Sequence, residues 1–224
     1  MTQMKKEQYI ALFGRVEALA DEKQAEKMSS YMQNRFPFLG LPKPKLMEAI
    51  KPFLRENGRG LPDWDFIDAC WQKDWREAQY IALEYLAKFK KKLTADDLPK
   101  LQKLITTKSW WETADTLDGF VGVIVLANPA LKDTMLEWSR SENLWLRRVA
   151  IDFQQRFGED TDAALLEEII GNSLGSREFF INKAIGWSLL EYSKTDPSWV
   201  AAFLEKYGGR LDKLSRREAT KYLS

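Results

Sequence analysis

The sequence predicts an all-α protein in which antiparallel helix pairs stack into an α-solenoid, and two observations lead to this fold class. Almost every segment between turn signals has apolar residues at helical spacing, and none alternates like a β-strand. An alanine followed three positions later by an aromatic residue also recurs along the chain. Its copies, separated by 68 (twice 34), 34 and 35 residues, begin at Ala82, Ala150, Ala184 and Ala219.

A repeat of this length is typical of stacked helix pairs, none of which can bury its apolar face alone. We therefore expect one continuous domain over residues 1–224, made of about six helix pairs. The second helices of the pairs should line a concave groove suited to an extended partner.

The first quarter of the chain predicts three helices. Residues 5–19 place their apolar side chains on one face, and a second helix is expected near 22–35. The proline- and glycine-rich segment 36–44 ends that helix. Residues 43–57 form the third helix, which Pro44 starts near its first turn.

Cap signals mark the helices in the middle of the chain. Asp63 precedes a helix, and residues 74–91 carry the first clear copy of the repeat. Thr94 and Ser109 each look like an N-cap with an acid three residues later, and the helix after Ser109 runs through Asp115. Glycines punctuate the remaining helices. These are expected near 130–140, 143–157, 161–170, 178–193, 197–207 and 215–223.

Composition excludes several classes of protein. The longest apolar run, residues 120–127, is eight residues long, whereas a membrane span needs about 20. The N-terminus has no apolar signal core, so we expect a cytoplasmic protein without a membrane partner. Cys70 is the only cysteine and there is no histidine, which excludes a disulfide within the chain, His-based zinc sites and Ser-His-Asp or Cys-His catalysis.

Four side chains are candidates for a functional site. Trp111 and Asp115 share one helix face because they are four residues apart, and Arg148 and Trp187 lie on the equivalent helices of later repeats. Two rings, a carboxylate and a guanidinium in one groove suit a flat or cationic ligand. Each residue could also have a purely structural role. The tryptophans could belong to the core, Asp115 could pair with a lysine or cap a neighbouring helix, and Arg148 could occupy a solvated position of the repeat.

Several ordered motifs resemble those of the DNA alkylation repair family, whose AlkD-type members are alkylpurine glycosylases built from HEAT-like repeats. Ser109-Trp110-Trp111-Glu112-Thr113-Ala114-Asp115 is similar to the family's Ser-Trp-Trp-acid-x-x-Asp motif. The resemblance covers nearly the whole chain. Its other motifs are residues 31–40, 75–77, 145–148, 179–187 and 191–194.

The resemblance implies a glycosylase that removes cationic alkylated purines, such as 3-methyladenine and 7-methylguanine, from double-stranded DNA without base flipping. Trp111 and Trp187 would then pack against the deoxyribose. Asp115 would stabilise the oxocarbenium-like sugar and help to position water, and Arg148 would bind a backbone phosphate. No metal or organic cofactor is implied, and we expect a monomer.

Three further residues, Trp110, Tyr31 and Lys183, are candidates for DNA contact through the same resemblance. Tyr31 either faces the groove or packs behind Phe36. The chain departs from the family pattern at Leu190, where an arginine is expected.

It departs again at Gln33, where a lysine is common, and the bulky ring of Phe179 could narrow the groove. With a net charge of only +1, these departures leave open a DNA-binding member with a relict site. A protein-interaction scaffold is the third hypothesis, because helical repeats most often serve that purpose.

Overall fold

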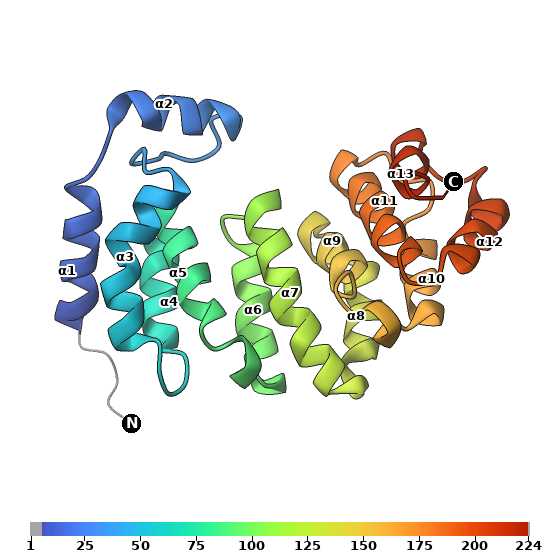
Figure 1. The fold of residues 1–224 in the computed structure, drawn as a ribbon, viewed down its shortest axis with the longest axis horizontal. Helices are drawn as coiled ribbons and strands as arrows, with labels where there is room; N and C mark the ends of the chain where they lie inside the picture. Colours follow the sequence, from blue (N-terminus) through green and yellow to red (C-terminus); the bar gives the residue numbers. More distant parts are fainter. Residues whose placement is uncertain (1–5, 224) are drawn as a thin grey trace. The chain divides into compact units, whose positions relative to one another are not determined.

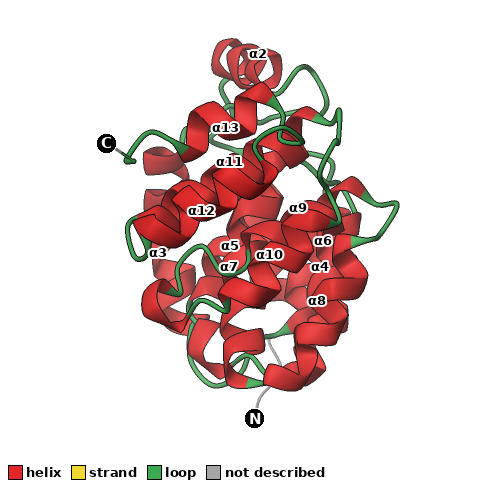
Figure 2. Ribbon diagram, turned by 90° about the vertical axis from the view of Figure 1, so that its right-hand side faces the viewer, coloured by secondary structure: helices red, strands yellow, loops and turns green. Residues whose placement is uncertain are grey.

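The computed structural model describes residues 6–223, whose regular secondary structure consists of helices joined by loops and turns (Figures 1 and 2). Within this range the chain forms thirteen α-helices and four short 3-10 turns, with no β-strand. The predicted all-α fold class of helix pairs is therefore confirmed. No helix among these residues is long and apolar enough to cross a membrane.

The chain divides into two compact units between Lys92 and Leu93. The single continuous domain stays a prediction from the sequence repeat. The helices of the first unit are α1 (Lys6–Glu17), α2 (Glu22–Tyr31), α3 (Lys43–Asn57), α4 (Trp64–Gln72) and α5 (Glu77–Ala87). Those of the second unit are α6 (Leu98–Thr106), α7 (Trp111–Ala127), α8 (Lys132–Ser139), α9 (Leu144–Asp152), α10 (Ala163–Gly171), α11 (Phe179–Ser193), α12 (Pro197–Tyr207) and α13 (Lys213–Ala219).

An aromatic core holds the first unit together. The buried ring of Phe66 in α4 lies 4.9 Å from the ring centroids of both Phe53 in α3 and Tyr85 in α5. Helix α4 begins as predicted, because the Asp63 side chain accepts a hydrogen bond from the Phe66 N–H at 3.2 Å. Burying rings of this size contributes most of the stability that such a short helix lacks on its own.

Helix α2 ends four residues earlier than the sequence pattern indicated, at Tyr31. Two of the four residues that should have continued it, Gln33 and Asn34, have φ angles of +57° and +55°. A left-handed backbone cannot continue a right-handed helix, so the chain turns before it reaches the proline-rich segment.

Glu77 of α5 fixes the segment that follows this turn. Its buried carboxylate accepts hydrogen bonds from the backbone N–H groups of Leu39, Gly40 and Leu41, at 3.0, 2.8 and 3.0 Å. Gly40 has a φ of +89°, and a Cβ there would lie 2.1 Å from the carbonyl oxygen of Asp21. Only glycine fits this close approach.

The two cap predictions at the start of the second unit have different outcomes. The capping box at Thr94 is confirmed, since its N–H donates to the Asp97 side chain at 3.0 Å. The predicted cap at Ser109 is wrong. Its hydroxyl donates instead to the Ile105 carbonyl, which the end of α6 leaves without a helical partner, and Trp110 is the residue before α7.

The repeat lies on the second helix of successive pairs, and its copies fall in α5, α9, α11 and at the end of α13. Helix α9 ends at Asp152, and α13 ends at Ala219, both earlier than predicted. Helices α11 and α13 approach closely at Gly186, where a Cβ would lie only 2.7 Å from the Glu218 Cβ. This contact fixes α11 in the second unit.

Candidate active site

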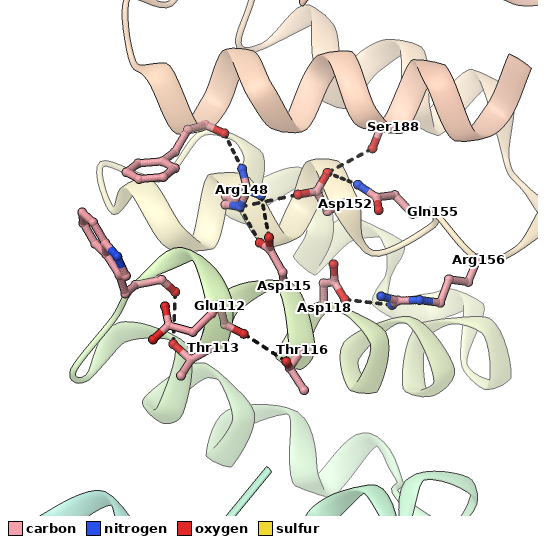
Figure 3. Close-up of polar contacts among 12 residues, drawn as sticks. Glu112, Thr113, Asp115, Thr116, Asp118, Arg148, Asp152, Gln155, Arg156 and Ser188 are labelled. Atoms are coloured by element: carbon pink, nitrogen blue, oxygen red, sulfur yellow. Dashed lines mark hydrogen bonds and ion pairs between the residues drawn. The ribbon is translucent and has the colours of Figure 1, made fainter. Parts of the chain in front are cut away.

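Three neighbouring helices of the second unit carry the predicted site. Helix α9 packs against both α7 and α11, so Asp115 of α7, Arg148 of α9 and Trp187 of α11 come together. Arg148 donates from Nε to Asp115 Oδ1 at 2.6 Å and from the terminal Nη2 to Oδ2 at 2.9 Å (Figure 3). This two-point contact fixes the orientation of the Asp115 carboxylate.

The Arg148 side chain is buried, with 2% of its surface exposed, whereas 24% of the Asp115 side chain remains exposed. The other terminal nitrogen of Arg148 donates to the Phe180 carbonyl at 2.6 Å. Burial alone would lower the pKa of Arg148, but the carboxylates of Asp152 and Asp115 raise it, so the guanidinium stays cationic. Because the guanidinium is buried against Asp115 and the Phe180 carbonyl, it presents little surface to a phosphate.

Trp187 lies beside two cations. The Arg148 Cζ is 5.9 Å from its ring centroid, and the Lys183 Nζ is 4.9 Å away. Lys183 also forms an ion pair with Glu218 of α13 at 3.0 Å. The Trp187 ring is therefore half-buried beside two cations, and the part that remains exposed is an apolar surface suited to packing against a sugar.

The two tryptophans of the motif at the start of α7 have different surroundings. Trp110 is buried, and its ring packs at 5.7 Å against Trp145 and at 5.1 Å against Phe180. Its ring therefore belongs to the core of the second unit and supports the start of α7. Trp111, the first residue of that helix, is half-buried and lies one turn before Asp115.

Tyr31, the remaining candidate, lies in the first unit, 72% exposed rather than buried behind Phe36. It lines a cavity of about 240 Å³ with Lys27 and Tyr80. Of the residues that depart from the family pattern, Leu190 is half-buried and Phe179 is exposed.

Sequence reasoning missed the residues behind Arg148. Asp152 and Asp118 are both buried, and the Asp152 Oδ2 lies 3.7 Å from the Arg148 Nε. Asp118 pairs with the largely exposed Arg156 at 3.0 Å. The available signal was an aspartate between the apolar residues Ile151 and Phe153, four positions after an arginine on the same helix.

The pKa values of both missed carboxyls are raised. Burial raises the pKa of Asp152 to about 6, with Asp115 adding to the rise and Arg148 opposing it. Burial, together with Asp152, raises the pKa of Asp118 well above its usual range. Carboxyls removed from water with incomplete pairing are typical of functional sites. Within residues 6–223, no group of three or more Cys, Asp or Glu side chains is arranged to hold a metal ion.

This geometry sits in a chain with a clear family relationship. A sequence profile described as "DNA alkylation repair enzyme" matches residues 14–223. The chain belongs to this family. A solved structure described as a predicted DNA alkylation repair enzyme from Enterococcus faecalis is 33% identical, with a TM-score of 0.84. The match covers 92% of this chain and 97% of the other, and no curated protein is recognisably similar.

Membership of the DNA alkylation repair enzyme family assigns the chain a role in the repair of alkylated DNA, and with it enzymatic repair activity and DNA binding. The chain spans almost the whole length of its solved relative, so the relationship extends over both units.

Proposed function

We propose that this protein is a DNA glycosylase that releases positively charged alkylated purines, such as 3-methyladenine and 7-methylguanine, from duplex DNA without base flipping. The observation that carries the proposal is the Asp115 carboxylate, which Arg148 holds at two points and which remains partly exposed. The motif from Ser109 to Asp115, similar to the glycosylase motif of the family, supports the same residue.

The chemistry needs few protein groups. When the N-glycosidic bond breaks, its electron pair stays on the purine, which becomes neutral because it began with a positive charge. The base can therefore leave without a general acid, which suits a chain that has no histidine. Positive charge develops on the sugar at C1′, where a fixed carboxylate stabilises it. Water then adds to C1′, and its proton passes to Asp115 or to solvent.

The remaining residues position the sugar and the carboxylate. Trp111 and Trp187 would pack against the deoxyribose and exclude water, as their place beside Asp115 and Arg148 suggests. Arg148 orients Asp115, and contact with a phosphate would be a second role. Trp110 would act through the start of α7, and Lys183 and Tyr31 would contact the DNA backbone. A cytoplasmic monomer remains our expectation.

The decisive experiment measures single-turnover release of 7-methylguanine from duplex DNA by the wild type and by Asp115→Asn. The variant keeps the side-chain shape but loses the charge, so we expect the rate constant to fall by about 10²- to 10³-fold. Asp133→Asn, an exposed aspartate of α8 in the same unit, is the matched control and should release base at the wild-type rate. An Asp115→Asn variant as active as the wild type would contradict the assigned role.

A non-catalytic DNA-binding protein with a relict site is the second candidate, and it is favoured by the loss of two cations at Leu190 and Gln33. Each missing phosphate contact weakens duplex binding and lowers its dependence on salt. This candidate predicts salt-sensitive binding to duplex DNA by a folded wild type that releases no base. The same assay therefore separates the two candidates.

A further inference from the structure

The ion pair of Asp115 and Arg148 has no net charge, and a second carboxylate lies close to the arginine. A carboxylate bound at two points by one guanidinium forms a pair with no net charge, and a neutral pair is a weak stabiliser of a developing cation. The second carboxylate near Arg148 is Asp152, whose Oδ2 lies 3.7 Å from the Nε. Figure 3 shows Arg148 between Asp115 and Asp152.

Asp115, Arg148 and Asp152 together carry one net negative charge. Asp152 and Arg148 are both buried, with 2% of each side chain exposed, so solvent does little to screen the charge between them. Asp115 is the member of this group that reaches the surface, and the excess charge therefore acts on a ligand through its carboxylate.

We propose that Asp152 is a positioning residue. Its negative charge offsets part of the positive charge of Arg148, so that the Asp115 carboxylate keeps its negative charge toward the reacting sugar. This inference rests on the proposed glycosylase function, because it concerns the rate of the same step. Asp152 touches no substrate in this proposal and acts only through Arg148.

The contacts of Asp152 agree with such a role, because its own charge is only partly neutralised. Gln155 donates one amide hydrogen to Oδ1. The Ser188 hydroxyl lies 3.2 Å from the same oxygen but 2.7 Å from the Ile151 carbonyl, and a hydroxyl has one hydrogen to donate. Asp152 thus keeps charge that attracts Arg148.

The protonation of Asp152 gives the proposal a pH dependence. Burial raises its pKa to about 6; Asp115 adds to the rise, and Arg148, Gln155 and Ser188 oppose it. Asp118 of α7 is the other carboxyl nearby, and Asp152 contributes to its raised pKa. The negative charge is therefore present above pH 6 and lost below it, so the rate of base release should rise through this range.

The test uses Asp152→Asn, which keeps the shape and removes the charge. We expect the single-turnover rate constant at pH 8 to fall by about 10- to 100-fold, and the rise through pH 6 to disappear. Affinity for undamaged duplex should stay equal or increase, because a negative charge near a polyanion is removed. A residue that served only to hold the fold would lower binding and rate together.

Asp118→Asn is the matched control, because Asp118 is equally buried and occupies the same slot of the repeat. It forms its ion pair with Arg156 at 3.0 Å and contributes least of the three aspartates that raise the pKa of Arg148, so its loss should lower the rate less than the loss of Asp152 does. If Asp152→Asn releases base at the wild-type rate, or if Asp118→Asn has the same effect as Asp152→Asn, the inference is wrong.

Two further measurements keep the test decisive. Should Asp152→Asn fail to fold, Gln155→Ala removes the amide donor that lowers the pKa of Asp152, so the rise in rate should move to higher pH. A wild-type rate that is flat between pH 5 and pH 7 would overturn the inference.

A wild type that releases no base would instead overturn the proposed function. In that case the thermal unfolding midpoint still tests the charge of Asp152. Asp152→Asn should unfold at a higher temperature than the wild type at pH 8 but not at pH 4. A variant whose unfolding midpoint lies below that of the wild type at both pH values would show that Asp152 is not held in the folded protein as an unbalanced negative charge.

Discussion

The buried carboxylates of Glu77 in the first unit and Asp152 in the second receive very different partners. Glu77 accepts hydrogen bonds from three consecutive backbone N–H groups, those of residues 39–41. Asp152 has one amide donor from Gln155, a hydroxyl at Ser188 that has a closer acceptor, and an arginine bound more closely by another carboxylate.

The difference between the two carboxylates lies in how completely their partners balance the charge. Backbone N–H groups that would otherwise be buried without acceptors balance the charge of Glu77, so both sides of the contact gain from folding. The charge of Asp152 has no such local balance, so we expect it to lower the stability of the folded state. A buried carboxyl in this state fits the positioning role proposed above for Asp152.

The largest effect is expected for Glu77→Ala, which tests whether the Glu77 carboxylate is structural. The substitution leaves three N–H groups without this acceptor, two of them buried, so we expect the free energy of unfolding to fall by about 3–5 kcal/mol, as for other broken buried charge contacts. Denaturant titration followed by circular dichroism measures the change. A loss below about 1 kcal/mol would mean that water replaces the carboxylate and that the loop does not depend on it.

The sequence predicted some of these contacts and not others, depending on how far apart the partners lie along the chain. The repeat predicted the helices, and helical spacing with the repeat placed Asp115, Arg148 and Trp187 in one site, because both are periodic properties of the chain. Contacts between repeats depend on rotamers and helix rotation. The chain gave no sign that Glu77 would reach a loop 36 to 38 residues away.

The dependence of contacts on rotamers also explains why the sequence did not predict the partners of Arg148. Its position on the right helix was predictable, but its direction was not, and the structure buries its guanidinium against Asp115 and the Phe180 carbonyl. The early end of α2 had a local cause that hydrophobic spacing does not encode, the left-handed backbone of Gln33 and Asn34. Short-range patterns therefore predicted elements well and side-chain partners poorly.

A smaller effect, with the opposite sign, is expected at Asp152. Because its pKa rises from 3.8 to about 6 on folding, the folded state binds this proton more tightly than the unfolded chain does. Stability is therefore lost as the pH rises between these two values, and the loss persists at higher pH. Asp152→Asn should remove the penalty and raise the free energy of unfolding at pH 8 by roughly 1–3 kcal/mol.

The control for this prediction is the pH itself. At about pH 4 the folded wild type already carries a protonated Asp152, so the two proteins should have nearly equal stability. Urea titrations at both pH values give the comparison. Equal stabilities at pH 8 would show that Arg148 fully balances Asp152, and Asp152 would then resemble Glu77 in being structural.

The smallest effect is expected at Glu84, which occupies in the first unit the repeat slot that Asp152 occupies in the second. Glu84 pairs with Lys43 at 2.8 Å, but 78% of the lysine side chain is exposed, so water screens the pair. Glu84→Gln should change the free energy of unfolding by less than about 0.5 kcal/mol at either pH. A change as large as that of Asp152→Asn would mean that the repeat slot, rather than burial beside Arg148, determines the cost of the charge.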